Sequence, residues 1–172
     1  MLKNKSNNYK PTHYTSDNNT RYLLGKIGKR NALFIGINPS KADSIIPDPT
    51  IKKIIGFANY NRYDGWFVVN IYPQRSTNPT DLHKKLDISI VKKNKKIIEK
   101  LLRDVQINAI VACWGRLIIS RYFLRGILLD IVKLKGLDKN KWVCIGKTLD
   151  GTPKHPSRHK YTKFKHFSLN KL

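Results

Sequence analysis

The segment NALFIGINPS at residues 31–40 indicates the centre of the fold. Because Leu33, Phe34 and Ile35 are consecutive apolar residues, an extended chain here would bury both of its faces, as strands inside a parallel sheet do. Three later segments have the same character: WFVVNI at 66–71, NAIVAC at 108–113 and WVCI at 142–145. The sequence therefore predicts four buried core strands.

Helical patterns occupy the segments between these strands. Asp48 and Pro49 have the residue types of an N-cap and a first helical position, and apolar residues recur at helical spacing behind them. Further helices are predicted at residues 89–105 and 115–130. In the last of these, four side chains are expected to face inward: Leu117, Ile118, Tyr122 and Leu129. The alternation predicts an α/β fold of three layers, α/β/α, around a mostly parallel, four-stranded central sheet.

The two ends of the chain differ from this core. Residues 1–20 are polar and nearly free of aliphatic side chains, so we expect a flexible N-terminal arm, followed by a single α/β domain at residues 21–172. Residues 21–26 (RYLLGK) could form a hairpin with residues 31–38. The basic C-terminal tail, residues 154–172, interleaves Lys and Arg with aromatic rings. Such rings either stack on a nucleic-acid strand or pack on the body of the domain, and the sequence leaves both open.

Net charge is the strongest compositional signal. The chain has 172 residues, with 34 Lys and Arg against 11 Asp and Glu, which gives a formal net charge of +23. A field of this size attracts polyanions, so nucleic acid is the expected partner. The alternative is a solvated basic surface that reflects biased composition.

Composition also excludes several classes of protein. Cys113 and Cys144 are too few for a disulfide scaffold or a four-cysteine metal site, and we expect no metal or other cofactor. No apolar run approaches the ~18–20 residues of a membrane span, and the first residues lack the apolar core of a secretory signal. We therefore expect a cytoplasmic, monomeric protein without a membrane partner.

Polar segments follow the predicted core strands directly. They are GINPS after the first strand, Asn70 after the second, CWG at 113–115 after the third, and a loop with HPS at 155–157 after the fourth. Ligands of open α/β sheets bind beyond the carboxyl ends of the strands. The sequence therefore predicts a site where these four segments converge.

These motifs, in this order, resemble those of the uracil-DNA glycosylase superfamily over residues 31–159. GINP at 36–39 is similar to the motif of its mismatch-specific uracil/thymine branch, and VVN at 68–70 to a strand-end LLN motif. CWG looks like the family's LWG, and HPS matches its HPS loop. The likeness extends to a bacterial and phage family within the superfamily, which implies the cytoplasm of a bacterial or phage-infected cell.

The resemblance implies a role for each motif residue. Asn38 would position the hydrolytic water, Asn70 would read the edge of a pyrimidine, and His155 would donate a hydrogen bond to the base O2. A side-chain amide orients water less forcefully than a carboxylate base, so Asn38 implies a slow enzyme. The residues expected to contact DNA are Ser157, Arg158, His159, Lys160, Lys163, Lys165 and Arg75.

Three features depart from the family pattern. Ser40 stands where the most active branch has a tyrosine, and it leaves room for a base substituent at C5. Residues 41–46 contain no aromatic ring to stack on the base, so Trp114 or Phe57 is expected to supply one. Arg158 and His159 stand where relatives insert a leucine wedge, which favours single-stranded or modified DNA as the substrate.

The leading functional hypothesis is a DNA glycosylase-like enzyme that hydrolyses the N-glycosidic bond of a deaminated or modified pyrimidine after base flipping, as in DNA repair. A catalytically silent nucleic-acid-binding relative is the first alternative, because the stacking ring and the wedge are missing from their usual places. An enzyme of free nucleotides is the second, although the net charge exceeds what such a substrate requires.

Overall fold

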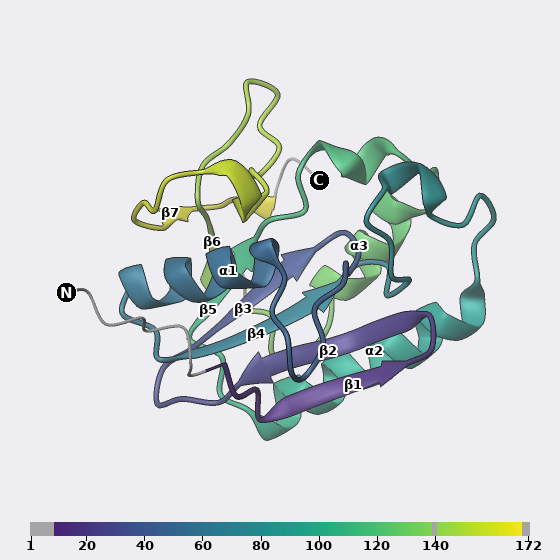
Figure 1. Ribbon diagram of the computed structural model, residues 1–172. Helices are drawn as coiled ribbons and strands as arrows, with labels where there is room; N and C mark the ends of the chain where they lie inside the picture. The colour runs from purple at the N-terminus through teal and green to yellow at the C-terminus, as the bar shows by residue number, and fades with distance from the viewer. Residues whose placement is uncertain (1–8, 139–140, 170–172) are drawn as a thin grey trace.

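Strand β3 (Asn31–Gly36) lies inside the sheet, as its apolar centre predicts (Figure 1). The computed structural model describes residues 9–138 and 141–169. Here β3 pairs in parallel with β4 (Gly65–Asn70) and β5 (Ala109–Ala112), and β5 pairs in parallel with β6 (Trp142–Cys144). All residues of β3 are buried, because it has a neighbouring strand on each side and helices over both faces.

Three antiparallel strands extend this parallel centre. β2 (Thr20–Lys26) pairs with β4, β1 (His13–Asp17) pairs with β2, and β7 (Lys165–His166) pairs with β6. The strand order is β1-β2-β4-β3-β5-β6-β7. The predicted α/β class is therefore confirmed, but the predicted four-stranded sheet is wrong, since the described residues form a sheet of seven strands. Edge strands such as β1 and β7 bury less side-chain surface, so they lack the apolar signal that reveals core strands.

Helices cover both faces of the sheet (Figure 1). α1 (Pro49–Tyr60) packs on one face, and α2 (Ile88–Asp104) and α3 (Leu124–Val132) pack on the other. Successive side chains of β3 point to opposite faces, so Phe34 joins the α1 core while Ile35 joins the core under α2 and α3. Among the helices that the structure describes, none is long and apolar enough to cross a membrane.

The predicted start of the first helix is confirmed, whereas α2 begins at Ile88, one residue before its predicted start. The Asp48 Oδ1 accepts a hydrogen bond from the Ile51 N–H at 2.8 Å, and Pro49 is the first residue of α1. Asp87 caps α2 in the same way, accepting from the Ser89 N–H at 2.9 Å. Such caps satisfy N–H groups that have no partner within the helix, so they fix where each helix begins. The N-terminus of α1 is thereby held at the carboxyl ends of the strands.

The helix predicted at residues 115–130 is interrupted. A 3₁₀ helix, Arg116–Ile119, precedes α3, and the guanidinium of Arg121 fixes the junction by donating to the Leu82 carbonyl at 2.8 Å and the His83 carbonyl at 3.0 Å. The interruption changes the helical register. Of the side chains expected to face inward, Ile118 is buried, but Leu117, Tyr122 and Leu129 are exposed. α3 instead buries Leu124, Ile127, Leu128 and Ile131.

The N-terminal part of the chain differs from two predictions. His13–Asp17, expected within a flexible arm, form β1, and residues 1–8 lie outside the described residues. β2 does not form a hairpin with β3 but lies beyond β4. Because β3 takes β4 and β5 as its two neighbours, the outer side of β4 is the place that remains for β2.

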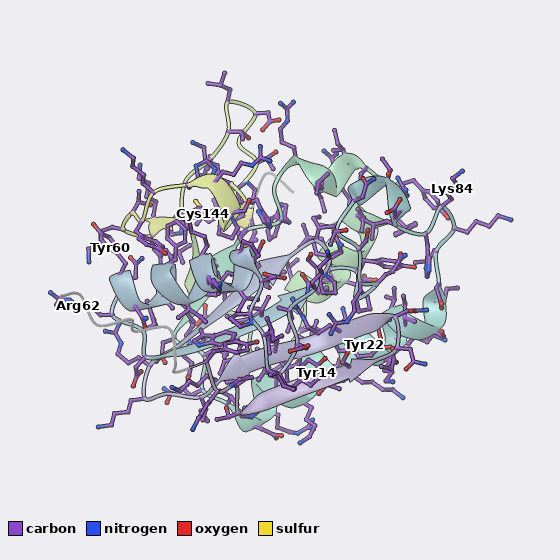
Figure 2. The ribbon with its side chains drawn as sticks, viewed as in Figure 1. Tyr14, Tyr22, Tyr60, Arg62, Lys84 and Cys144 are labelled. Atoms are coloured by element: carbon purple, nitrogen blue, oxygen red, sulfur yellow. The ribbon has the colours of Figure 1, made fainter. Side chains whose placement is uncertain are left out.

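The described part of the C-terminal tail, residues 154–169, packs on the body of the domain, and residues 170–172 lie outside the described residues. Phe167 is only 4 % exposed and contacts Trp114 with ring centroids 5.6 Å apart. Tyr161 stacks on Tyr60, which Figure 2 labels at the end of α1, and it fits over Gly56, where an added Cβ would come within 2.3 Å of the phenol oxygen. Of the two alternatives that the sequence leaves open, the structure therefore favours packing for these rings.

Candidate functional site

A cavity of about 180 Å³ lies at the carboxyl ends of β3, β4 and β5, beside the N-terminus of α1. Four residues to which the sequence motifs point line it together: Asn38, Ser40, Asn70 and His155. They come from segments up to 117 residues apart, and the parallel strand order brings them to one edge of the sheet. This cavity is therefore the candidate site.

Asn38 follows β3 with its amide group held in a fixed orientation. Its Nδ2 donates to the Ser76 carbonyl at 2.9 Å and to the Pro39 carbonyl at 3.1 Å. Both amide hydrogens are thus used within the protein. Within residues 9–138 and 141–169 no group donates to the Oδ1, so this oxygen can accept a hydrogen bond from a water molecule or a ligand.

Asn70 ends β4 with its side chain 3 % exposed. Its backbone carbonyl accepts a hydrogen bond of 2.8 Å from Nδ2 of Asn94, a buried residue of α2 that fixes this strand end. Gly36 leaves room for the side chain, since a Cβ there would come within 3.0 Å of the Asn70 Oδ1. The Nδ2 of Asn70 is buried without a partner among the described residues. An unpaired buried donor is costly, so a ligand in the cavity would satisfy it with an acceptor.

His155 caps a short 3₁₀ helix, Pro156–Arg158, with its imidazole ring. The Nδ1 accepts from the Ser157 N–H at 3.4 Å and lies 2.9 Å from the Ser157 Oγ. Because a backbone N–H only donates, Nδ1 is an acceptor, and the neutral ring carries its proton on Nε2. Burial lowers the pKa of His155 from its usual 6.5, against an opposing effect of the Asp48 charge. At neutral pH the ring is therefore an uncharged donor at the cavity.

Gly115 allows the loop after β5 to approach His155 closely. Its φ of +67° lies in the left-handed region, and its N–H donates to the Pro153 carbonyl at 3.1 Å. A Cβ at this position would come within 3.3 Å of the Cβ of His155. A glycine is therefore required in the CWG motif, because it lets the loop that carries His155 lie close to the end of β5.

Two charged residues line the cavity although no motif indicates a ligand-binding role for them. Arg21, at the start of β2, is 3 % exposed, and its Nη1 donates to the Ala42 carbonyl at 3.1 Å. Asp48, the cap of α1, accepts from the Ala42 N–H at 3.1 Å with its second oxygen. In the sequence, Arg21 is only a charged residue at the edge of an apolar segment. Its position at the cavity follows from the pairing of that segment with β4, which is distant in sequence.

The expected stacking rings lie elsewhere. Trp114 is 1 % exposed, with its ring against Trp142, and it lines a second cavity of about 370 Å³ instead. Phe57 is fully buried under Tyr161 in the core between α1 and the sheet. The assignment of either ring to base stacking is therefore wrong. In the described part of the chain, His155 is the one aromatic ring that lines the candidate cavity.

Arg75 connects the loop after β3 to the edge of the sheet. Its Nη1 donates to the carbonyls of Ser40 at 2.9 Å and Ala42 at 3.0 Å, and its Nη2 donates to the Tyr14 hydroxyl at 2.8 Å. Figure 2 shows Tyr14 on the outer strand β1. Arg75 therefore has a structural role in placing Ser40. Arg75 and Ser40 also line a neighbouring hollow at the rim.

The other residues expected to contact DNA surround the HPS loop and the tail. Arg158, Lys160 and Lys165 are exposed, whereas Ser157 is engaged with His155. The carbonyl of His159 accepts from the Lys53 Nζ at 2.9 Å. Lys163 lies over the ring of Tyr60 at 5.1 Å and donates to its carbonyl at 3.3 Å. Among the described residues, the side chains of Lys160 and Lys165 make no hydrogen bond or ion pair and are therefore available to a ligand.

Cys113 also reaches the cavity wall. Burial raises the pKa of its thiol to about 12, and the Sγ donates to the Ile35 carbonyl at 3.3 Å. The thiolate is the nucleophilic form of cysteine, so this group is chemically inert at neutral pH.

The fold and the site define a class of protein: an α/β protein with a small polar cavity beyond the carboxyl ends of its parallel strands. Residues 21–157 match a family described as "Protein of unknown function (DUF1643)", and the chain belongs to this family. The matched region begins at Arg21 and contains the whole lining of the cavity. No curated protein and no solved structure matches the chain.

Proposed function

We propose that the protein is a DNA glycosylase-like enzyme, with a uracil-DNA glycosylase-like fold, that hydrolyses the N-glycosidic bond of a deaminated or modified pyrimidine in DNA. The observation that carries this proposal is that Asn38, Asn70 and His155 line one cavity. One residue supplies an acceptor for water, and the other two supply donors for a base. These are the groups that the reaction requires.

The size of the cavity favours a base over a whole nucleotide. An apolar cavity of ~150 Å³ holds a benzene molecule, whereas sites for drug-sized ligands measure ~300–1,000 Å³. At about 180 Å³ the cavity has room for one six-membered ring. The sugar and phosphates would then lie outside, as they do when an enzyme takes a single base out of a strand. This argues against free nucleotides as the substrate.

Asn38 is suited to orienting the nucleophile. Its amide hydrogens are held by the Pro39 and Ser76 carbonyls, so its Oδ1 can accept from a water molecule without turning away. The water oxygen forms a bond to C1′ of the sugar as the C1′–N1 bond breaks, and the proton that this water loses passes through solvent to the departing base, which is released neutral. The electron pair of the broken bond stays on the base, and its charge spreads to O2.

His155 is suited to stabilising that charge. A donor aimed at the atom where charge develops is worth more in the transition state than in the ground state. The Nε2–H of neutral His155 is such a donor, and its orientation is fixed through Nδ1 by Ser157. The unpartnered Nδ2 of Asn70 would bind a carbonyl oxygen of the same ring.

Basic side chains at the rim support a nucleic-acid substrate. Lys41 lies in the hollow next to Ser40. On the opposite side, Lys154 precedes His155 and the exposed Arg158 follows it. Together with the net charge of +23, these side chains provide a positive surface for the phosphates on both sides of a flipped base.

A silent nucleic-acid-binding protein is the second candidate. The observation that favours it is that no Trp, Tyr or Phe of the described residues lines the cavity. Stacking on an aromatic ring stabilises an unstacked base. A protein without such a ring would hold a flipped base more weakly and could bind DNA without releasing a base.

Base release distinguishes the two candidates. Oligonucleotides that carry uracil, a T:G mismatch or 5-modified pyrimidines are incubated with the protein and scored for abasic sites. We expect release from at least one substrate, and a loss of ~10²–10³ in rate for His155→Ala and for Asn38→Ala. Affinity for DNA should change little in either variant, because the basic surface is intact.

Matched controls separate chemistry from general damage. Asn59→Ala, on the exposed side of α1, and His166→Ala, on exposed β7, remove the same side chains away from the cavity and should leave the rate unchanged. Binding without base release from any substrate would establish the silent binder. Release that is insensitive to His155→Ala would refute the role of this residue.

A further inference from the structure

Arg21 is a buried cation in the cavity wall. It is 3 % exposed, and among the described residues no carboxylate lies within 4.0 Å of its guanidinium. Its Nη1 donates to the Ala42 carbonyl, but its Nε has no partner in the described part of the chain. Burial lowers the pKa of Arg21 to about 10, so the group stays charged at neutral pH. A buried charge without a partner is unfavourable, and an anionic ligand would relieve this.

The groups around Arg21 do not neutralise it. Asp48 is the carboxylate that most favours its charge, but both Asp48 oxygens accept backbone hydrogen bonds, from Ile51 and Ala42. Arg75 opposes its charge. Tyr9 and Tyr14 also face it, and burial raises the pKa of Tyr9 to about 12. Arg21 thus shares this end of the cavity with the Asp48 carboxylate, while Arg75 and Asp43 act on each other beside it.

The strand order places Arg21 and His155 at opposite ends of the cavity. Arg21 starts β2, on the outer side of β4, and its N–H donates to the Pro73 carbonyl at 3.0 Å beyond the end of β4. His155 comes from the loop after β6, on the other side of β3 and β5. Asn70 and Gly36, at the ends of β4 and β3, lie between them in this order.

This arrangement matches the geometry of a pyrimidine. C2 and C5 are para to each other, so a ring whose O2 meets His155 directs its C5 substituent to the Arg21 end. The unpartnered Nδ2 of Asn70 requires an acceptor, which the O4 of a uracil-type ring provides and the amino group of cytosine does not. Ser40 leaves space that a tyrosine would fill.

We infer that the site selects uracil-type bases that carry an anionic substituent on C5, with a carboxylate as the simplest case, and that Arg21 binds this substituent. This inference rests on the glycosylase-like function proposed above, because it uses the same orientation of the base. A guanidinium binds a carboxylate through charge-assisted hydrogen bonds, and Arg21 has the Nε free for one of them.

Binding of free bases tests the inference without catalysis. Uracil, 5-carboxyuracil and 6-carboxyuracil are titrated into the full chain, with the Kd measured by calorimetry. The last compound carries the same charge at a position that does not face Arg21. We expect 5-carboxyuracil to bind about tenfold more tightly than the other two. Arg21→Met should abolish this preference, and Arg21→Lys should keep part of it.

Base release provides the second arm. Oligonucleotides of one sequence carry uracil, thymine or 5-carboxyuracil at a single position, and wild type is compared with Arg21→Met and with Arg62→Met. Arg62 lies at the far end of α1 (Figure 2), so its variant is a charge-matched control. We expect 5-carboxyuracil to be released fastest by wild type and by Arg62→Met, and this preference to be absent in Arg21→Met. Should Arg21→Met fail to fold, wild type and Arg21→Lys are compared instead, and a smaller preference for 5-carboxyuracil in Arg21→Lys would support the role of Arg21.

The outcomes separate this inference from the proposed function. Equal affinity and equal release for uracil and 5-carboxyuracil would overturn the role of Arg21 and leave the glycosylase function intact. Tighter binding of 5-carboxyuracil that depends on Arg21, with no base released from any oligonucleotide, would support the ligand assignment and overturn the glycosylase function. Preference for 6-carboxyuracil would overturn the proposed orientation of the base.

Discussion

The protonation state of His155 links the candidate site to stability. Burial lowers its pKa below 6.5, so as pH falls from about 6.5 the unfolded chain takes up a proton before the folded protein does. The free energy of unfolding should therefore decrease from pH 6.5 down to the lowered pKa of the folded state. His155→Gln should reduce this decrease, as measured by denaturant unfolding at pH 7.5 and pH 5.5.

A second histidine, His159, also lowers the free energy of unfolding as pH falls. Burial also lowers the pKa of His159. His155→Gln should therefore leave a residual slope, which the double variant with His159→Gln removes. A stability that is equally sensitive to pH in wild type and in the double variant would show that neither ring loses a proton on folding.

Gly115 offers a test of how closely two loops must approach. Its φ of +67° with a ψ of −173° is a conformation that essentially only glycine adopts, so another residue is disfavoured by ~1–3 kcal/mol, and an added methyl group would press on His155. Gly115→Ala should lower stability by this amount and should slow base release, since the imidazole is displaced. Gly126→Ala in α3 is the matched control, because its Cβ would meet nothing within 4 Å, and it should stabilise by ~0.5–1 kcal/mol. The measurements are denaturant unfolding and the abasic-site assay.

At the scale of the elements, the tail residue Phe167 belongs to the folded core. Phe167 is 4 % exposed between β6 and the ring of Trp114. Phe167→Ala should cost ~3–5 kcal/mol in the free energy of unfolding. His166→Ala, one residue away on the exposed side, should cost far less. Equal effects in urea denaturation would show that the tail does not belong to the folded core.

The elements that the sequence predicts correctly are those with an unambiguous apolar pattern. β3 to β6 are recognisable because strands buried on both faces lack polar residues in their centres. α1 is recognisable because Asp48 caps a helical repeat, and α2 because its apolar residues recur at helical spacing. β1 could not be predicted in this way, since HYTSD carries almost no apolar signal. The break before α3 depends on Arg121 bonding to carbonyls some forty residues away, which no local pattern reveals.

The same reasoning applies to the candidate site. Asn38, Asn70 and His155 were predictable because polar residues at the ends of parallel strands must meet at one edge. Trp114 and Phe57 were not, because the sequence does not show whether a ring near a strand end faces the cavity or the core. Arg21 was missed because its place depends on the pairing of β2 with β4.

At the scale of the whole molecule, the positive charge acts in two ways. Charges spread over the surface attract any polyanion, whereas charges at the rim of the cavity contact phosphates of a bound strand. The net charge of +23 does not distinguish these contributions. The salt dependence of DNA affinity distinguishes the two contributions, because each phosphate that is neutralised releases counterions and steepens the fall of affinity with salt.

The last prediction therefore compares two triple variants of equal net charge. Lys41 lies in the hollow beside Ser40, and Lys154 and Arg158 lie on the loop that carries His155. In contrast, Lys92, Lys96 and Arg103 are exposed residues of α2, across the sheet from α1. If duplex DNA binds with about six phosphate contacts, affinity should fall about a thousandfold between 50 and 200 mM salt. Replacing the first three by Gln should lower the slope of log K against log salt by about three units, and replacing the second three should leave it nearly unchanged. Fluorescence anisotropy with one labelled oligonucleotide gives both slopes. If the slope of log K against log salt falls by the same amount in both triple variants, DNA is held by the overall positive field of the protein. The strand then does not bind at the cavity.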